Sequence, residues 1–279
     1  MLTFGNKILT HNDEWIGKYV DPWDTIGEDA YTIRFKFDDT SFVPQINEDQ
    51  QESGYTWTQV GDGVWDYYTR FNSMEGSGTL HDTGYFIRTT NIEEANQTYS
   101  VIGASLSKMT YGTRLPVYAT GMFSSMNGLK RISNWPREAA MTQNSSMFKD
   151  SKNLEYVDYI IVEGSPTSMF YGCTSLKSVN ITMAATQFMS AIFNGCSSLE
   201  SCKITFTGSG NAVGTVRNMF NGCVNLNGQD MLAAYNWLST HIPSDAETSR
   251  CFYNCGTNTA SGRAARAQIP TTWGGDLEV

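Results

Sequence analysis

The clearest pattern along the chain is a recurring apolar pair, in most copies Met-Phe, followed by a leucine six residues after the phenylalanine. Five copies carry it, and successive phenylalanines are 22 to 27 residues apart. A fixed period of this length is typical of solenoids, in which each repeat forms one turn of a coil and buries its apolar face against its neighbours. The repeated residues are therefore predicted to form the structural core: Phe123, Phe148, Phe170, Phe193 and Phe220, with Leu129, Leu154, Leu176, Leu199 and Leu226.

Two further apolar positions follow the leucines of the middle repeats, and they are two residues apart. These positions are Val157 and Tyr159, Val179 and Ile181, and Cys202 and Ile204. Residues two apart on a strand point to the same face, so the pattern predicts one short parallel strand per leucine-rich repeat. The phenylalanines are expected on the opposite wall of the coil, stacked as a continuous spine.

The rest of the chain shows other periods. Aromatic and aliphatic residues alternate with polar ones over residues 31–37, and again over 55–58 and 64–68 around a Gly-Asp-Gly turn. Both patterns predict a small antiparallel β unit. Residues 229–238 have helical spacing and an acid in the first turn. The predicted fold is therefore mainly β, of the α+β class: an N-terminal antiparallel β unit, a short leucine-rich-repeat solenoid and a C-terminal helical cap.

The predicted organisation has four parts: an acidic arm (1–30), a small β unit that is a candidate attachment domain (31–97), the solenoid (98–256), and a C-terminal strap or tail (257–279). The arm carries the aromatic residues Trp15, Tyr19 and Trp23 among its acids. Two interpretations remain open for it. It is either a solvated arm or a segment that docks on a partner subunit with these aromatics as anchors.

Charge separates the two ends of the chain. The net charge is −9, with 19 basic and 28 acidic residues, which argues against a nucleic-acid partner. Residues 1–97 hold 6 basic and 17 acidic side chains, whereas residues 98–256 hold 11 and 9. The acidic end is thus predicted to be the attachment side, and the near-neutral coil the recognition side.

Candidate catalytic chemistry is sparse. The three histidines are far apart in the sequence and have no zinc-ligand spacing. All six cysteines follow residue 172, and four of them keep the phase of the repeats, which predicts buried thiols; Cys251 and Cys255 could also form a disulfide or a metal half-site. We predict no catalytic residue, metal or cofactor, and no enzymatic activity. Neither a signal peptide nor an apolar run long enough for membrane insertion is readable.

The predicted strands also have outward-facing positions, which form two columns of candidate ligand-binding residues. One column is Ser133, Asp158, Asn180 and Lys203, and the other is Arg131, Tyr156, Ser178 and Ser201. They are either ordinary solvated residues or a recognition surface. Residues 178–199 contain no charged side chain, and this hydroxyl- and amide-rich stretch suits hydrogen bonding to sugars better than capture of an ion.

The repeat unit M-F-x-G-C-x-S-L-x-S-(V/C)-x-I resembles the BspA-type leucine-rich repeats of bacterial surface adhesins and of short bacteriophage and prophage structural proteins. Parts of the flanks, such as residues 31–35 and 267–273, are also similar to the phage-type version. The resemblance implies a structural virion protein of a phage tail, tail fibre or baseplate, assembled in the host cytoplasm. The alternative is a bacterial cell-surface adhesion module.

The same resemblance implies the partners. The N-terminal part would bind other virion proteins, and the repeats would bind a host cell-surface glycan or protein or a neighbouring virion subunit. Since fibre proteins are often oligomeric, a homo-oligomer is a further expectation.

Overall fold

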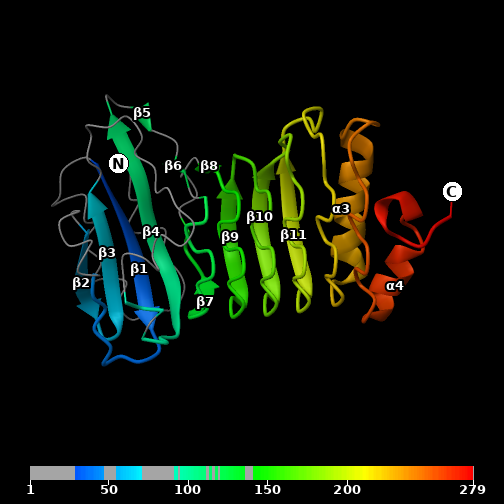
Figure 1. The fold of residues 1–279 in the computed structure, drawn as a ribbon. Helices are drawn as coiled ribbons and strands as arrows, with labels where there is room; N and C mark the ends of the chain where they lie inside the picture. The colour runs from blue at the N-terminus through cyan, green and yellow to red at the C-terminus, as the bar shows by residue number, and fades with distance from the viewer. Residues whose placement is uncertain are drawn as a thin grey trace.

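The computed structural model describes residues 29–46, 55–70, 91–93, 95–110, 113–114, 117–118, 120–135 and 141–278. Figure 1 shows the strands side by side, with the helices at the C-terminal end. The elements in chain order are β1 (Asp29–Phe37), β2 (Tyr55–Gly61), β3 (Val64–Arg70), β4 (Tyr99–Thr110), β5 (Thr113–Arg114), β6 (Val117–Tyr118), β7 (Leu129–Ile132), β8 (Met141–Gln143), β9 (Tyr156–Val162), β10 (Ser178–Ala184), β11 (Ser201–Thr207), α3 (Gly228–His241), α4 (Ala260–Arg266) and the 3-10 helix η5 (Thr271–Trp273).

One mixed sheet runs through the molecule in the order β11-β10-β9-β7-β4-β1-β3-β2, with β5 paired to β4, and β6 pairs with β8 separately. The predicted β unit is antiparallel, because β1 pairs antiparallel with both β3 and β4. Strand β4 also pairs parallel with β7, and β7, β9, β10 and β11 continue in parallel. The predicted fold class is thus confirmed, and the sheet passes without a break from the β unit into the solenoid.

The predicted phenylalanine spine is present inside the coil. The rings of Phe123, Phe148, Phe170, Phe193, Phe220 and Phe252 form one stack, with neighbouring centroids 5.1–5.4 Å apart and planes within 2–15° of parallel. These side chains and the five repeat leucines are buried. Offset-stacked aromatic pairs add stability beyond the area they bury, so the stack holds consecutive turns together.

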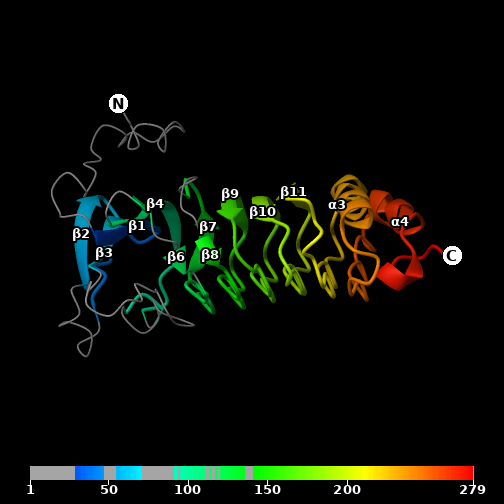
Figure 2. The same cartoon turned by 90° about the horizontal axis from the view of Figure 1, so that it is seen from above.

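The wall opposite the strands is a regular series of turns (Figure 2). The phenylalanine N–H of one turn donates to a carbonyl of the next, as from Phe148 to Met169 and from Phe170 to Ile192, both at 2.8 Å. Residues two before and two after each phenylalanine have positive φ. Glycine adopts this conformation without strain. It occupies the second position in three repeats, whereas Asp150 adopts the same conformation where glycine is missing.

The position that follows the second positive-φ residue of each turn is a cysteine in three repeats, and its contacts explain why a thiol is buried there. The thiol of Cys173 donates to the carbonyl of Phe148 at 3.0 Å, and Cys196 and Cys223 make the same bond one and two turns later. In the second repeat a buried serine replaces the cysteine, and its hydroxyl donates to Phe123 at 2.6 Å. All six cysteines are buried and unbonded. Cys251 and Cys255 therefore form no disulfide.

One predicted strand residue points the wrong way. The apolar spacing after Leu154 placed Tyr159 on the inner face, but Ile160 is fully buried there and Tyr159 is half-buried on the other side. The cause is an extra residue in β9: Val157 pairs with Val179 and Ile160 pairs with Ile181, so the register shifts between them. A one-residue bulge reverses the direction of the side chains that follow it.

The C-terminal end of the sheet is closed by α3 and by segments beyond it. The Asn227 side chain caps α3 by accepting from the Asp230 N–H. The Asp230 carboxylate in turn accepts from the Cys202 N–H at 2.9 Å. The segment after residue 256, predicted as a strap or tail, contains a second helix, α4, which begins at the capping residue Thr259. Gly228 in α3 allows close approach, since a Cβ there would lie 2.1 Å from the carbonyl oxygen of Ser261.

The first turn of the solenoid is capped by a single carboxylate. Glu93 accepts hydrogen bonds from the backbone N–H groups of Asn127 and Gly128 and from the hydroxyl of Tyr99, at 2.9–3.0 Å. In later turns, N–H groups after the phenylalanine turn bond to the preceding repeat, as Ser175 does to Lys152. Glu93 therefore stands in for a preceding repeat.

Replacing Glu93 by glutamine should lower the free energy of unfolding by about 1–3 kcal/mol, because one acceptor oxygen and the charge are lost while the donors stay in place. Urea unfolding measures the change. Glu163→Gln, at an exposed position after β9, is the matched control and should have little effect. Equal effects of the two substitutions would contradict the capping role of Glu93.

Candidate functional site

The candidate site is the outer face of the four parallel strands, which we call the outer strand face. Pairing of β7, β9, β10 and β11 brings the predicted column that begins with Arg131 together: Arg131 lies beside Tyr156, Tyr156 beside Ser178, and Ser178 beside Ser201. Inward neighbours such as Val157 and Val179 are buried in the core. Because each strand is fixed by this packing, the column is held on a rigid surface.

The predicted column that begins with Ser133 is less regular. Asn180 and Lys203 are paired and exposed, but the bulge in β9 places both Asp158 and Tyr159 opposite Asn180. Ser133 lies just beyond the end of β7, where its backbone N–H and its hydroxyl both bond to the carbonyl of Val101. The structure therefore brings three of the four residues together and turns Ser133 toward β4.

Charges in the β7–β9 half of the outer strand face are paired with one another. The Arg131 guanidinium contacts both oxygens of Asp158 at 2.7–3.1 Å, and its Cζ lies 5.3 Å from the ring centroid of Tyr156. The Lys177 ammonium lies 5.5 Å from the same centroid and 2.5 Å from Glu155. Its hydrogen bond to Glu155 raises the pKa of Lys177. This half is therefore a network in which opposite charges compensate each other.

The β10–β11 half is mostly neutral. Ser178, Asn180 and Thr182 point outward from β10, and Thr182 is paired with the exposed Thr205 of β11. Thr182 also shares a hydrogen bond of 3.2 Å with the hydroxyl of Tyr159. Among the residues that the structure describes, Lys203 has no ion-pair partner. This half can thus offer hydroxyl groups, one amide and one ammonium to a ligand.

Three outward residues were missed by the sequence analysis: Tyr159, Thr182 and Thr205. The two threonines continue the alternation by one further step, so the period of two was a sufficient signal for them. Tyr159 had no such signal, because the bulge that exposes it is set by pairing with β10. Ser201, which was predicted as a ligand residue, is already engaged, since its hydroxyl donates to Asp230 at 2.8 Å.

The outer strand face is suited to binding by hydrogen bonds and charge. No group of three or more metal-ligating His, Cys, Asp or Glu side chains occurs within the described residues. Burial raises the pKa of all six thiols, which makes them poor nucleophiles.

No helix of the described part of the chain is long and apolar enough to cross a membrane. The arm residues Trp15, Tyr19 and Trp23 lie outside the described residues.

Comparison with known proteins identifies the repeats. A family model described as "BspA type Leucine rich repeat region (6 copies)" matches residues 103–227 and, in an overlapping match, residues 165–261. Together the two matches cover more than half of the chain. Neither a curated protein nor a solved structure matches the chain.

Proposed function

The chain belongs to the BspA-type leucine-rich repeat family, and from this premise we propose that it is a non-enzymatic recognition protein of a phage virion. It would sit in a tail fibre, baseplate or other appendage, with its N-terminal part bound to other virion proteins. Its repeats would contact a host-surface glycan or protein, or a neighbouring virion subunit. The second candidate is a bacterial cell-surface adhesion module, which the same repeats would also suit.

The outer strand face carries the proposal. It presents exposed polar residues from successive turns, among them Asp158, Asn180 and Lys203, on a sheet whose inner side is packed. Repeat proteins use such surfaces for recognition because the stacked turns hold many side chains in fixed positions. The virion assignment has a different support, which is the similarity of the flanking segments to phage-type proteins with these repeats.

Substitutions on the neutral half of the outer strand face test its role in binding. We expect the double variant Asn180→Asp with Lys203→Glu to bind envelopes of the bacterial host at least about tenfold more weakly, because two new negative charges replace an amide and an ammonium. The measurement is the affinity of fluorescently labelled protein for isolated envelopes. Digestion of the envelopes with polysaccharide lyases or with protease distinguishes a glycan from a protein receptor.

A matched control makes the same chemical changes elsewhere. Asn211→Asp with Lys152→Glu alters an exposed loop residue and an exposed residue of the turn wall, and it should leave binding unchanged. Equal loss in both variants would show that charge alone governs binding and would remove the outer strand face as the site.

The virion assignment is tested separately. Electron microscopy with gold-labelled antibody to the chain should place label on phage particles released after prophage induction. Label on bacterial envelopes but never on particles would overturn the virion proposal in favour of the adhesion module.

A further inference from the structure

The two edge strands of the sheet differ in whether another element covers them. At the C-terminal end, β11 is covered by α3, and the backbone N–H of Cys202 is bound by Asp230. At the other end, β2 is the last strand of the sheet, and β3 is the only strand with which it pairs within the described part of the chain. Strand β2 therefore presents one row of backbone N–H and C=O groups without a described partner strand. Such an edge is a template for another strand.

Strand β2 lacks two of the usual protections of an edge, which are charge and proline. Natural edge strands are commonly blocked by charged residues, proline or bulges. The sequence of β2 is YTWTQVG, which contains no charged residue and no proline. Its register shift lies between Gln59 and Gly61, next to the turn into β3. The remaining part of the strand is regular and rich in residues that favour strands.

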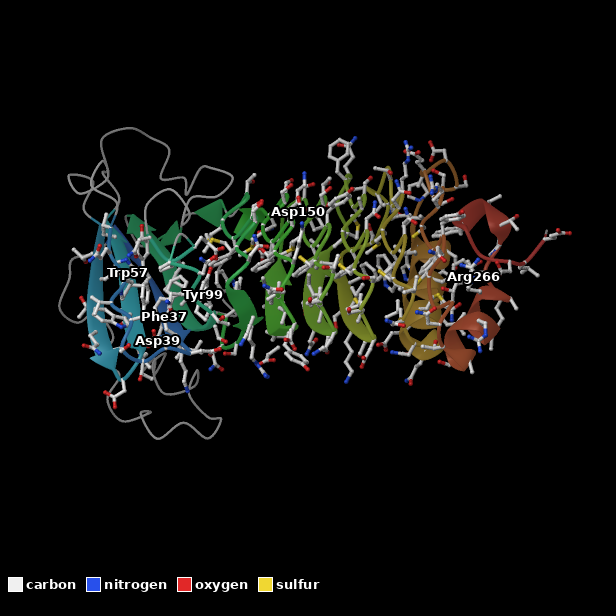
Figure 3. All side chains as sticks on the ribbon, turned by 60° about the horizontal axis from the view of Figure 1, so that its bottom comes forward. Phe37, Asp39, Trp57, Tyr99, Asp150 and Arg266 are labelled. Atoms are coloured by element: carbon white, nitrogen blue, oxygen red, sulfur yellow. The ribbon has the colours of Figure 1, made fainter. Side chains whose placement is uncertain are left out.

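The hydrophobic core reaches this edge. Trp57 is only half-buried, and the centroid of its ring lies 5.3 Å from that of Phe35 and 4.9 Å from that of Tyr67. Figure 3 places Trp57 and Phe37 at the end of the molecule opposite Arg266. Phe42 packs against Phe37 at 5.0 Å and is also half-buried. The aromatic core therefore extends to the β2 edge and is only partly covered there, which leaves apolar surface that a partner strand could bury.

We propose that β2 pairs with β2 of a second copy of the chain, antiparallel across a two-fold axis, so that the sheets of two protomers become continuous. A two-fold interface must be complementary to itself. An uncharged strand meets this requirement because no like charges face each other when it pairs antiparallel with its own copy. Within the described residues of this region, β1 and β3 already have a partner strand on both sides, which leaves β2 as the strand able to pair with a second copy. The inference is independent of the ligand and of the virion assignment.

The mass of the full chain in solution is the first test. Light scattering after size exclusion should give twice the chain mass of 31.0 kDa for the natural sequence. Thr56→Lys with Thr58→Lys places exposed cations on both copies of β2 and should raise the dissociation constant at least about tenfold. Thr205→Lys with Thr207→Lys makes the same change at exposed positions of β11 and should leave the dimer intact.

Cross-linking tests the geometry. Opposed residues of an antiparallel pair have Cα atoms 4.5–5.5 Å apart, within the range of a disulfide. Single cysteines placed along β2 at positions 56 to 59 should give a covalent dimer near the two-fold axis, whereas Thr205→Cys should give none. The six natural thiols are buried and provide little background.

Three results would overturn the proposal. The first is a monomer at every concentration, and the second is a dimer that both lysine pairs leave equally intact. The third is the absence of any cross-link along β2, with slow amide exchange there in a monomer, which would show that another segment of the same chain covers the edge.

Discussion

Replacing Phe170 with alanine should lower the free energy of unfolding by about 3–5 kcal/mol, which is a large part of the stability of a chain of this kind. Phe170 is fully buried in the middle of the aromatic stack, with centroids 5.1 Å from Phe148 and 5.3 Å from Phe193. The substitution opens a cavity and removes two stacked pairs at once. The backbone ladder of the turn wall passes through the same residue, so little local collapse is available to fill the space.

Urea unfolding followed by circular dichroism measures this change, and the next residue supplies the control. Tyr171 is 38% exposed on the outside of the turn wall, and its described ring contact is with the ammonium of Lys149 at 5.5 Å. Tyr171→Ala should therefore cost less than about 1 kcal/mol. If the two variants were equally stable, the spine would not be the main support of the coil.

Much of this fold was predictable because the same apolar residues recur at the same positions of each repeat. A phenylalanine recurs every 22 to 27 residues, and a single repeat cannot bury this side chain alone. Stacking of successive repeats follows from this requirement. The alternation in β10 and β11 likewise predicted which side chains point outward. These features depend on residues close together in the sequence.

The features that the sequence did not predict depend on contacts between residues that are far apart in the sequence. The direction of Tyr159 is set by one extra residue in β9 relative to β10, and no spacing within β9 reveals it. The continuity of the sheet depends on β4 pairing antiparallel on one side and parallel on the other. The two caps, Glu93 and Asp230, accept hydrogen bonds from backbone N–H groups of residues 28 to 35 positions away. A lone acid in the sequence carries no mark of such a role.

For the candidate site, the sequence predicted which side chains point outward but not which of them contact each other. The sequence placed Arg131 and Asp158 on one face, but it did not predict that they neutralise each other. Which charges remain available to a ligand is decided by side-chain contacts between neighbouring turns. The structure therefore shifts the recognition surface toward the neutral strands β10 and β11.

Raising the pH from 8 to 10 should lower the free energy of unfolding by several kcal/mol, on the order of 1 kcal/mol for each buried thiol. Burial raises the pKa of all six thiols, to about 12 for Cys255, so they stay protonated in the folded chain. In the unfolded chain they ionise above their ordinary pKa of 9.0. Unfolding therefore releases protons above pH 9, and stability falls there as the pH rises, by on the order of 1 kcal/mol per pH unit for each thiol that stays protonated in the folded chain.

The effect is fully absent below pH 8, and it continues to grow above pH 10, where the buried Tyr99 joins the thiols because burial raises its pKa above 10.0. Urea unfolding at pH 7 to 10.5 with a reductant present measures the slope. Cys173→Ser is the matched variant, because Ser151 already occupies the same repeat position with the same hydrogen bond to the preceding phenylalanine. It should recover one thiol's share of the loss at pH 10, on the order of 1 kcal/mol. A natural chain that is equally stable at pH 8 and pH 10 would show that the thiols titrate freely and are not sealed in the core.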